Sequence, residues 1–552
     1  MTNASISPNA NQQQNLNQNS ETATDGETRT GVKRRPSRNQ SLPATSDDHT
    51  LDYAACRPEL QGKTPGEYVQ IALRLKAFES IVQPKLDAIN AKRAEAIPGE
   101  RGRRGPRAVY HAEDFFILKL LRRVVGAKTT KATRDWLTED RADSTRHQLG
   151  FDIERPHVGG KQRLLMSGIP SDPWMSTFSK KYLSDEQLEA LLEEFEYEAL
   201  MEKIEKVPGA YEETFAVNID GSKYETCGTP PKRRKKEDGS VVTNAGHVTA
   251  PDAGYIPDKG YNANHSGAGW NPLLFTGSKG TVYLHHRVPM HYSEGKELGK
   301  AAAKLGQLFE DIDLRFGPQG VSKVVRIATA DSAFNCKEAR LGLRAIKVLE
   351  NIQISSHGHG DKTKAAAERR DDRELEIEGY PNWKVNGHRE FCCKCGLGKV
   401  SRLIGCSKRH GTVARVRGEC KNCGTITITS GLWWLSGNTF KKISKHKREL
   451  KTRQKRTGKA IEPDFSFGHP LTYHDEISRE YGTARFANQE GLFGSQFTNR
   501  FGILEGKRRV YRGVQVDIDF CFTVIIMHAL AIEHHRLAQS ADRSPPIPTL
   551  TA

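Results

Sequence analysis

Apolar residues recur at helical spacing in the first part of the chain. In 183–200 a capping box at Ser184 precedes apolar side chains that share one helical face: Leu188, Leu191, Leu192 and Phe195. An amphipathic helix is also expected within 101–126, and a shorter helix at 130–137. The pattern therefore predicts an all-α region over 51–207. Its two closely joined helices fit either a helix-turn-helix or a plain helical bundle.

The hydrophobic pattern changes after residue 207. Short apolar strands are expected at 214–222, 281–288, 324–331 and 352–355. Amphipathic helices are expected at 295–317 and 337–350. Strands followed by strand–helix alternation predict an α/β fold, a mixed sheet flanked by helices.

The longest apolar stretch is 520–532. It is shorter than the roughly 20 residues that a membrane-spanning helix needs, so we expect a buried core helix and no membrane contact. Residues 1–50 are rich in Asn, Gln, Ser and Thr and are predicted to be disordered.

These changes in composition divide the chain into six predicted segments. They are a disordered tail (1–50), a helical region (51–207), the first part of an α/β core (208–385), a cysteine-rich insertion (386–435), a basic segment with the C-terminal part of the core (436–537), and a flexible tail (538–552).

The charge of the chain points to a polyanionic partner. The 552 residues include 84 Lys and Arg against 67 Asp and Glu, a formal net charge of +17. Nucleic acid is the partner that such a balance most often indicates. Two basic runs are candidate phosphate contacts, one around Arg101, Arg103, Arg104 and Arg107, and one at 441–459 that includes Lys447, Arg448 and Arg453.

Most of the ten cysteines are clustered between 392 and 423. Cys392 and Cys395 form one C-x-x-C pair, and Cys420 and Cys423 form a second. Two such pairs, each continuing into glycine, predict a zinc ribbon with a structural Zn²⁺ held by four thiolates. Cys393 and Cys406 compete as ligands or stay free. Clustered thiols of this kind indicate a reducing compartment, so we expect a cytoplasmic protein.

Two acids stand where predicted strands end, Asp220 in VNIDGS and Asp331 in ATADSAF. A third, Glu490, lies in RFANQEGLFG on an expected helix. A single acid at a strand end is more often a turn or cap residue. Three carboxylates that converge could instead hold two Mg²⁺ ions, or Mn²⁺, for phosphodiester chemistry.

Three segments, taken in their order along the chain, resemble the catalytic domain of DDE-type transposases of prokaryotic insertion sequences. They are FAVNIDGS, IATADSAFN and ANQEGLFGSQFTNRFGILEGKRRVYRG. The resemblance covers about 100–535 and implies an RNase H-like core with an N-terminal helical DNA-binding domain. It makes Asp220, Asp331 and Glu490 the metal-binding catalytic acids, with Asp475 and Glu476 as alternatives for the third. Arg485 and Arg500 would contact phosphate.

The resemblance implies metal-dependent DNA strand cleavage followed by strand transfer. It also implies DNA as partner, a homodimer or higher oligomer on that DNA, and a nucleoid-associated location in the cytoplasm. Two alternatives stay open, an RNase H-like nuclease without strand transfer and a catalytically inactive DNA-binding protein derived from a mobile element.

Overall fold

A computed structural model describes most of the chain from residue 63 onward. The described residues are 63–95, 110–151, 155–156, 165–166, 168–235, 241–244, 248–256, 267–317, 324, 326–352, 374–386, 391–407, 411–429, 433–436, 439–458, 492, 497–498, 501–504 and 507–542. Several predictions fall outside them: the disordered tail, Arg101, Arg103, Arg104, Arg107, Asp475, Glu476, Arg485, Glu490 and Arg500.

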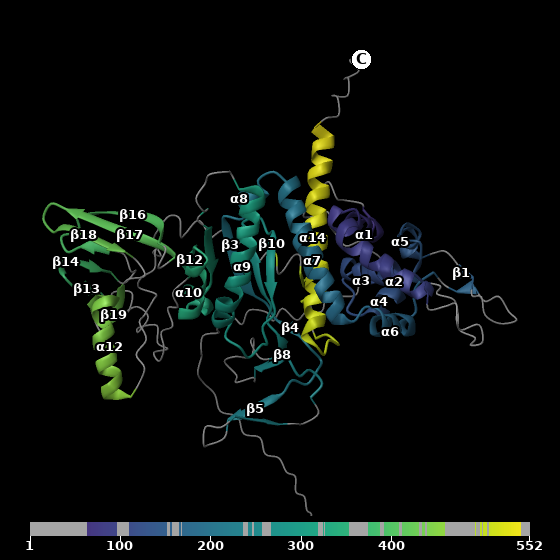
Figure 1. Cartoon of the computed structure of the whole chain (residues 1–552), viewed down its shortest axis with the longest axis horizontal. Helices are drawn as coiled ribbons and strands as arrows, with labels where there is room; N and C mark the ends of the chain where they lie inside the picture. The colour runs from purple at the N-terminus through teal and green to yellow at the C-terminus, as the bar shows by residue number, and fades with distance from the viewer. Residues whose placement is uncertain are drawn as a thin grey trace, which may run out of the picture. The chain divides into compact units, whose positions relative to one another are not determined.

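Helices fill the described part of the predicted all-α region (Figure 1). They are α1 (Pro65–Leu73), a π-helical turn (Phe78–Val82), α2 (Gln83–Glu95), α3 (Ala112–Val124), α4 (Thr130–Leu137), a 3-10 turn (Asp140–Ala142), α5 (Asp143–Leu149), α6 (Asp172–Lys181) and α7 (Asp185–Lys206). A two-residue pair, β1 (Arg155–Pro156) and β2 (Leu165–Met166), interrupts them. The short helix α8 (Ala210–Glu213) follows just after this region. The capping box before α7 is present, because Ser184 and Gln187 each accept the other's backbone N–H.

A five-stranded mixed sheet follows, in the order β10-β9-β3-β11-β12. Its strands are β3 (Ala216–Gly221), β9 (Leu273–Thr276), β10 (Val282–His286), β11 (Arg326–Ala330) and β12 (Val348–Ile352). β3, β11 and β12 run parallel, whereas β9 and β10 are antiparallel to their neighbours. Helices α9 (Glu294–Phe316) and α10 (Lys337–Ala345) contribute to the hydrophobic core of this sheet. The predicted mixed sheet flanked by helices is therefore confirmed.

Smaller strands extend from the same part of the chain. They are β4 (Tyr224–Glu225), β7 (Gly254–Ile256) and β8 (Gly267–Trp270), which form one sheet, and the hairpin of β5 (Lys232–Lys235) and β6 (Val241–Asn244).

The predicted helix at 337–350 is too long. α10 ends at Ala345, and β12 begins at Val348, where the sequence had indicated a strand only from 352. Lys347 between them has a φ of 62°, a left-handed conformation that stops a helix. Every residue of β12 is buried, so its side chains show no alternation that could distinguish this strand from the end of a helix.

The cysteine-rich segment forms a β module of its own, which we call the cysteine module (375–442). One sheet has the order β15-β14-β13-β20-β19, and a second has the order β16-β17-β18. The strands are β13 (Leu375–Ile377), β14 (Tyr380–Val385), β15 (Phe391–Cys393), β16 (Lys399–Ser407), β17 (Gly411–Cys420), β18 (Gly424–Thr429), β19 (Trp433–Ser436) and β20 (Thr439–Lys442). The module has a separate hydrophobic cluster centred on Trp383, and helix α12 (Ile443–Thr457) follows β20 directly.

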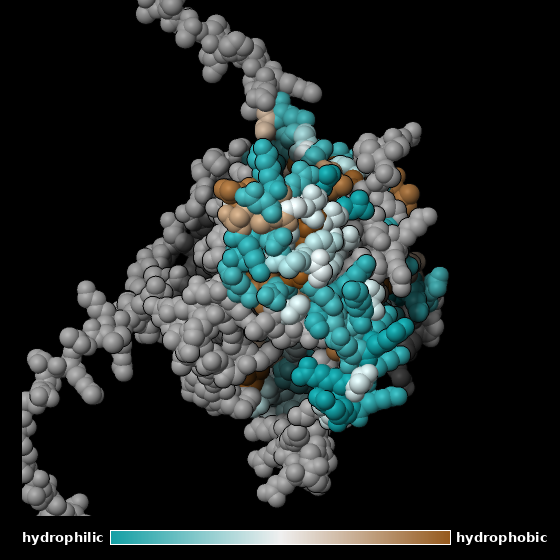
Figure 2. Space-filling view, turned by 90° about the vertical axis from the view of Figure 1, so that its left-hand side faces the viewer, coloured by the Kyte–Doolittle hydropathy of each residue, from teal (hydrophilic) through white to brown (hydrophobic). Residues whose placement is uncertain are grey.

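Hydrophilic residues predominate on the side of the molecule that faces the viewer in Figure 2.

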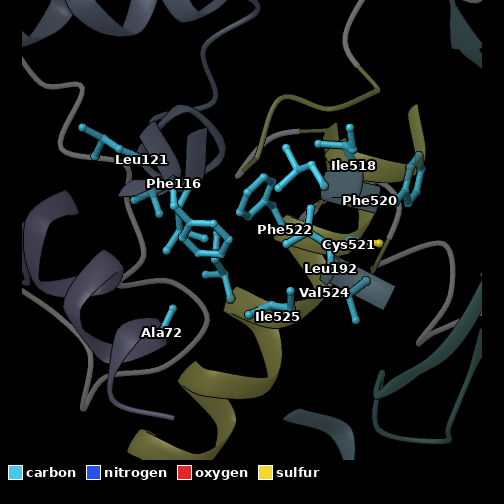
Figure 3. Packing of buried hydrophobic residues seen from close by; sticks show 14 of the residues in the cluster. Ala72, Phe116, Leu121, Leu192, Ile518, Phe520, Cys521, Phe522, Val524 and Ile525 are labelled. Atoms are coloured by element: carbon cyan, nitrogen blue, oxygen red, sulfur yellow. The ribbon is translucent and has the colours of Figure 1, made fainter. Parts of the chain in front are cut away.

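The last helix, α14 (Gly513–Asp542), contains the buried helix predicted at 520–532. It continues to Asp542, so the first residues of the predicted flexible tail, 538–542, are helical. Figure 3 shows its side chains Phe522 and Ile525 near Phe116 of α3 and Ala72 of α1. The rings of Phe116 and Phe522 are 5.2 Å apart. Among the described residues this helix alone is long and apolar enough to cross a bilayer, and 83% of its apolar window is buried inside the protein. The helices at the start of the chain and α14 thus share one core.

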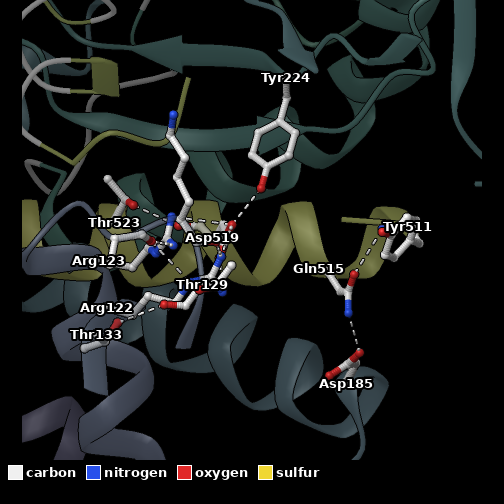
Figure 4. Close-up of polar contacts among 12 residues, drawn as sticks. Arg122, Arg123, Thr129, Thr133, Asp185, Tyr224, Tyr511, Gln515, Asp519 and Thr523 are labelled. Atoms are coloured by element: carbon white, nitrogen blue, oxygen red, sulfur yellow. Dashed lines mark hydrogen bonds and ion pairs between the residues drawn. The ribbon is translucent and has the colours of Figure 1, made fainter. Parts of the chain in front are cut away.

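A polar network is enclosed beside this core (Figure 4). Asp519 of α14 pairs with Arg122 and Arg123 of α3, each at 3.4 Å, and accepts a hydrogen bond from the hydroxyl of Tyr224 at 2.7 Å. Burial alone would raise the pKa of Asp519, but Arg122, Arg123 and the buried Arg508 outweigh it and lower the pKa to about 2. The network therefore ties α3, β4 and α14 together through one ionised carboxylate.

Candidate functional site

The two strand-end aspartates lie at the same edge of the five-stranded sheet. β3 and β11 are parallel neighbours, and Ile219 of β3 is the register partner of Ala330 of β11. Asp220 and Asp331 each follow one of these partners, so the parallel register brings both to the carboxyl end of the two strands. That edge is where open α/β sheets bind ligands.

The backbone around both aspartates fixes their carboxylates. Oδ1 of Asp331 accepts a hydrogen bond from the N–H of Ala333 at 2.8 Å and so caps the 3-10 turn Ser332–Phe334. Oδ1 of Asp220 accepts the N–H of Gly221 at 2.9 Å. Asp331 can therefore cap the turn and also serve as a metal ligand, because the capping hydrogen bond holds its side chain in one orientation.

A third carboxylate, Glu294, lies beside them and was missed by the sequence analysis. Its Oε1 accepts a hydrogen bond from Nδ2 of Asn271. The same oxygen lies close to Gly221, the residue after Asp220, because a Cβ atom added at that glycine would be 3.0 Å from it. Burial raises the pKa of Glu294 to about 7, with further contributions from the charges of Asp331 and Asp220. Asp220, Asp331 and Glu294 therefore lie near enough for their charges to interact, and we call these three carboxylates the acid cluster.

The acid cluster suits a hard divalent cation. Carboxylate oxygens are the ligands that Mg²⁺ prefers. A cation would also offset the charges of Asp331 and Asp220, which add to the effect of burial in raising the pKa of Glu294. Glu490, the third acid expected from the sequence, lies outside the described residues. Its place relative to Asp220 and Asp331 therefore stays a prediction.

Glu294 gave only a weak signal in the sequence. It is the first residue of α9, directly after Ser293, and acidic residues in the first turn commonly stabilise a helix. What brings it to the aspartates is the packing of α9 against the sheet, which the sequence pattern does not contain.

The cysteine module gathers four thiols at one point. The sulfur atoms of Cys393, Cys395, Cys420 and Cys423 all lie within 4.8 Å of one another. Cys395 Sγ is 3.4 Å from Cys393 Sγ, 3.3 Å from Cys420 Sγ and 3.5 Å from Cys423 Sγ. Four sulfurs at Zn–S distances of about 2.3 Å in a tetrahedron are separated by roughly 3.8 Å, so the cluster fits Zn²⁺ after a small expansion.

The prediction of Cys392 as a ligand is corrected by this geometry. Neighbouring residues of a strand point to opposite faces, and in β15 it is Cys393 that is buried and joins the cluster. The thiol of Cys392 instead lies 3.8 Å from the backbone oxygen of Lys384. The backbone N–H of Gly398 donates to Cys393 Sγ at 3.0 Å, the kind of contact that favours a thiolate.

The basic run at 441–459 is mostly the exposed helix α12. Its residues include seven lysines and arginines against one acid, Glu449. Lys447, Arg448 and Arg453, the predicted DNA contacts, are all exposed. His446 is the buried residue of this helix and lies 3.3 Å from Glu378 of the cysteine module. The helix is thus attached near its beginning and presents its cations to solvent.

Comparisons with known proteins add little to this picture. No family model matches the chain, and no curated protein matches it. Among solved structures it is similar to a piggyBac transposase synaptic complex with hairpin DNA, at 12% identity and a TM-score of 0.30, over 88% of this chain and 83% of that one. A TM-score of 0.30 is too low to carry an argument about fold or function.

Proposed function

We propose that this protein is a DDE-type transposase that cleaves DNA strands at the ends of an insertion sequence and transfers the freed 3′-hydroxyl to target DNA. The observation that supports the proposal is that Asp220 and Asp331 stand at the same end of two neighbouring parallel strands, with Glu294 near enough for its charge to interact with both. The resemblance of the sequence around these aspartates to transposases supplies the reaction class.

The arrangement of the sheet supports an RNase H-like core. The first aspartate lies on the opening strand of the sheet and the second follows a later strand that pairs with it, which is the placement that the resemblance implies. In this proposal the helices of 51–207 are the DNA-binding region, and the cysteine module is a zinc ribbon inserted between Asp331 and Glu490.

The acid cluster would hold two Mg²⁺ or Mn²⁺ ions, with Glu490 as a further ligand. When bound, such ions lower the pKa of an attacking water or 3′-hydroxyl and neutralise charge at the phosphate. The chain's own contribution is orientation. Ala333 N–H holds Asp331, Gly221 N–H holds Asp220, and Asn271 holds Glu294. Fixed carboxylates need no reorganisation when the metal and the phosphate arrive.

The exposed cations of α12 would contact the DNA backbone, with Arg101, Arg103, Arg104, Arg107, Arg485 and Arg500 as further proposed contacts. Because a transposase joins two element ends, we expect a homodimer or higher oligomer on DNA. A cytoplasmic, nucleoid-associated location follows from the same proposal.

The test uses DNA duplexes that carry the sequences flanking the gene, with labelled strands and added Mg²⁺ or Mn²⁺. Asp220→Asn, Asp331→Asn and Glu294→Gln are expected to reduce cleavage to background while DNA affinity stays near that of the unchanged protein. Glu310→Gln is the matched control, because Glu310 is an exposed glutamate on the same helix as Glu294. Cleavage by Asp331→Asn at the unaltered rate would remove the acid cluster from the chemistry.

A second assay separates the alternatives. A precleaved end with a free 3′-hydroxyl is supplied with a supercoiled plasmid, and joined products are counted. Joining supports a transposase, whereas cleavage without joining supports a nuclease. DNA binding with neither reaction supports an inactive DNA-binding protein.

A further inference from the structure

A second group of potential metal ligands lies apart from the acid cluster and the cysteine module. Ligand atoms of Glu196 on α7, His285 on β10 and Cys521 on α14 all lie within 4.8 Å of one another. Asp517, one turn before Cys521, joins them, since its Oδ1 is 3.8 Å from Nε2 of His285. The group sits where three elements that are distant in sequence pack together.

The two ring nitrogens of His285 face different partners. Nδ1 lies 3.5 Å from Oε1 of Glu196, whereas Nε2 lies 4.0 Å from Sγ of Cys521 and 3.8 Å from Oδ1 of Asp517. The ring also stacks against Phe520, with centroids 5.7 Å apart, which fixes its plane. A carboxylate beside one nitrogen and donor atoms beside the other is the usual setting of a metal-binding histidine.

The two donors on α14 are spaced to act together. Asp517 and Cys521 are four residues apart and therefore lie on one face of the helix. The other carboxylate oxygen of Asp517, Oδ2, pairs with Arg287 at 2.9 Å. That ion pair holds Asp517 in place while Oδ1 remains directed at His285, as supporting contacts do for metal-ligating carboxylates.

Two polar atoms in this group are enclosed without a hydrogen bond. The side chains of His285 and Glu196 are 8% and 11% exposed, and within the described part of the chain neither Nδ1 of His285 nor Oε2 of Glu196 has a hydrogen-bond partner. Enclosed polar atoms without partners are costly, and the partners of the ring nitrogens lie 3.5 to 4.0 Å away, at the long end for hydrogen bonds.

We infer that this group is a second zinc site, with Nε2 of His285, Sγ of Cys521 and Oδ1 of Asp517 as ligands and Glu196 orienting the histidine. A mixed nitrogen, sulfur and oxygen shell is one that Zn²⁺ accepts. Tetrahedral Zn²⁺ would place the other two donors roughly 3.3–3.6 Å from Nε2. The distances of 3.8 and 4.0 Å require an inward movement of about half an ångström, which side-chain rotation of Asp517 and Cys521 supplies.

The competing state of the same group is an ion network without metal. Burial lowers the pKa of His285, but the carboxylates of Glu196 and Asp517 outweigh it and raise the pKa to about 9. In that state an imidazolium would be shared between two carboxylates and Cys521 would stay a neutral thiol. Zinc binding would release one proton from Nε2 of the ring and one from the thiol of Cys521. The two states therefore differ in both proton content and metal content.

With three protein ligands, the fourth position of a tetrahedral Zn²⁺ would be filled by water, and the site would act structurally. It would join the sheet, through β10, to α7 and α14, and it is enclosed rather than open to substrate. Its occupancy is therefore independent of the reaction proposed for the acid cluster.

The experiment measures zinc per chain by elemental analysis after the purified full chain is incubated with zinc sulfate and dialysed. We expect two zinc ions in the unchanged protein, one in Cys521→Ala and one in Asp517→Asn. Cys227→Ala should keep two, because Cys227 is an exposed cysteine outside both clusters. The double variant Cys420→Ser, Cys423→Ser should keep one, and with Co²⁺ in place of zinc it should show the visible absorption of a tetrahedral site with one thiolate.

Circular dichroism checks that each variant is folded. If Cys521→Ala does not fold, Asp517→Asn decides, because it preserves the size of the side chain and removes only the ligand charge. One zinc ion in the unchanged protein that disappears with Cys420→Ser, Cys423→Ser would overturn the inference and identify His285 as a shared imidazolium. Two zinc ions in folded Asp517→Asn would overturn it as well.

Discussion

Tyr224 donates a hydrogen bond to Asp519 across 2.7 Å, although 295 residues separate them in the chain. The pair connects β4, next to the sheet, with the last helix, and Asp519 is enclosed with Arg122 and Arg123 on its other side. One carboxylate thus serves as the shared counter-charge of two guanidinium groups, Arg122 and the buried Arg123.

Replacing Asp519 with asparagine should lower the free energy of unfolding by about 3–5 kcal/mol, because the arginines would stay buried without a counter-charge. Tyr224→Phe should cost only about 1 kcal/mol, the value of one hydrogen bond. Urea unfolding followed by circular dichroism measures both. Asp311→Asn, a change on α9 outside this network, is the control and should stay within about 0.5 kcal/mol. Equal losses for the two network variants would contradict the role given to the charge.

The same network predicts how stability responds to acid. The pKa of Asp519 falls from 3.8 to about 2 on folding, so its contribution is fully present above pH 4 and is lost as pH falls toward 2. The shift corresponds to about 2 kcal/mol. Unfolding curves between pH 7 and pH 2 should show that the difference in free energy of unfolding between the unchanged protein and Asp519→Asn shrinks by about that amount. A constant difference over this range would rule out an ionised Asp519 as the cause.

Cys392 and Cys393 offer a matched pair for the zinc site of the cysteine module. Cys393→Ser removes a thiol of the cluster and should weaken zinc binding strongly, whereas Cys392→Ser should leave it unchanged. Competition with a chromogenic chelator measures the affinity of each variant. The reverse result would show that the strand turns its other face to the metal.

Asn271 is expected to matter for metal binding at the acid cluster because its amide holds Glu294. Asn271→Ala should weaken Mg²⁺-dependent cleavage by about 10–100-fold, the usual effect of removing a side chain that supports a metal ligand. DNA affinity and thermal stability should stay near their original values. Gln307→Ala, which removes an exposed amide–carboxylate hydrogen bond on α9, serves as control. An unaltered metal requirement in Asn271→Ala would argue that Glu294 does not take part.

The charges of α12 can be tested through salt. A triple variant in which Lys447, Arg448 and Arg453 are all replaced by alanine should bind duplex DNA with a weaker salt dependence. The slope of log affinity against log salt concentration should fall by up to about 2.7, roughly 0.9 for each phosphate that the helix no longer neutralises. The variant Lys447→Arg, Arg448→Lys, Arg453→Lys keeps the charge and should keep the slope. If the alanine variant retains the original slope, α12 does not bind the backbone.

Much of the fold could be predicted from residue spacing. The helix at 183–200 and the strands that carry Asp220 and Asp331 follow from local patterns that the final packing reinforces. The division between α10 and β12 could not be predicted, because a strand buried on both faces has no alternation to detect.

The candidate sites were predictable only in part for similar reasons. Asp220 and Asp331 could be singled out because each ends an apolar strand, but Glu294 gives no comparable local signal. The choice between Cys392 and Cys393 depends on which face of β15 turns inward, and adjacent cysteines in a sequence do not reveal that.

The shared core of the first helices and α14 has a consequence for the order of events during protein synthesis. α3 and α7 leave the ribosome hundreds of residues before Phe522 and Ile525, the side chains that cover them. Until translation is nearly complete, their apolar surfaces remain without their final neighbours. The nascent chain therefore depends on chaperones or on provisional packing of these surfaces. A chain terminated before residue 513 would lack α14, and the cell's proteases should remove it.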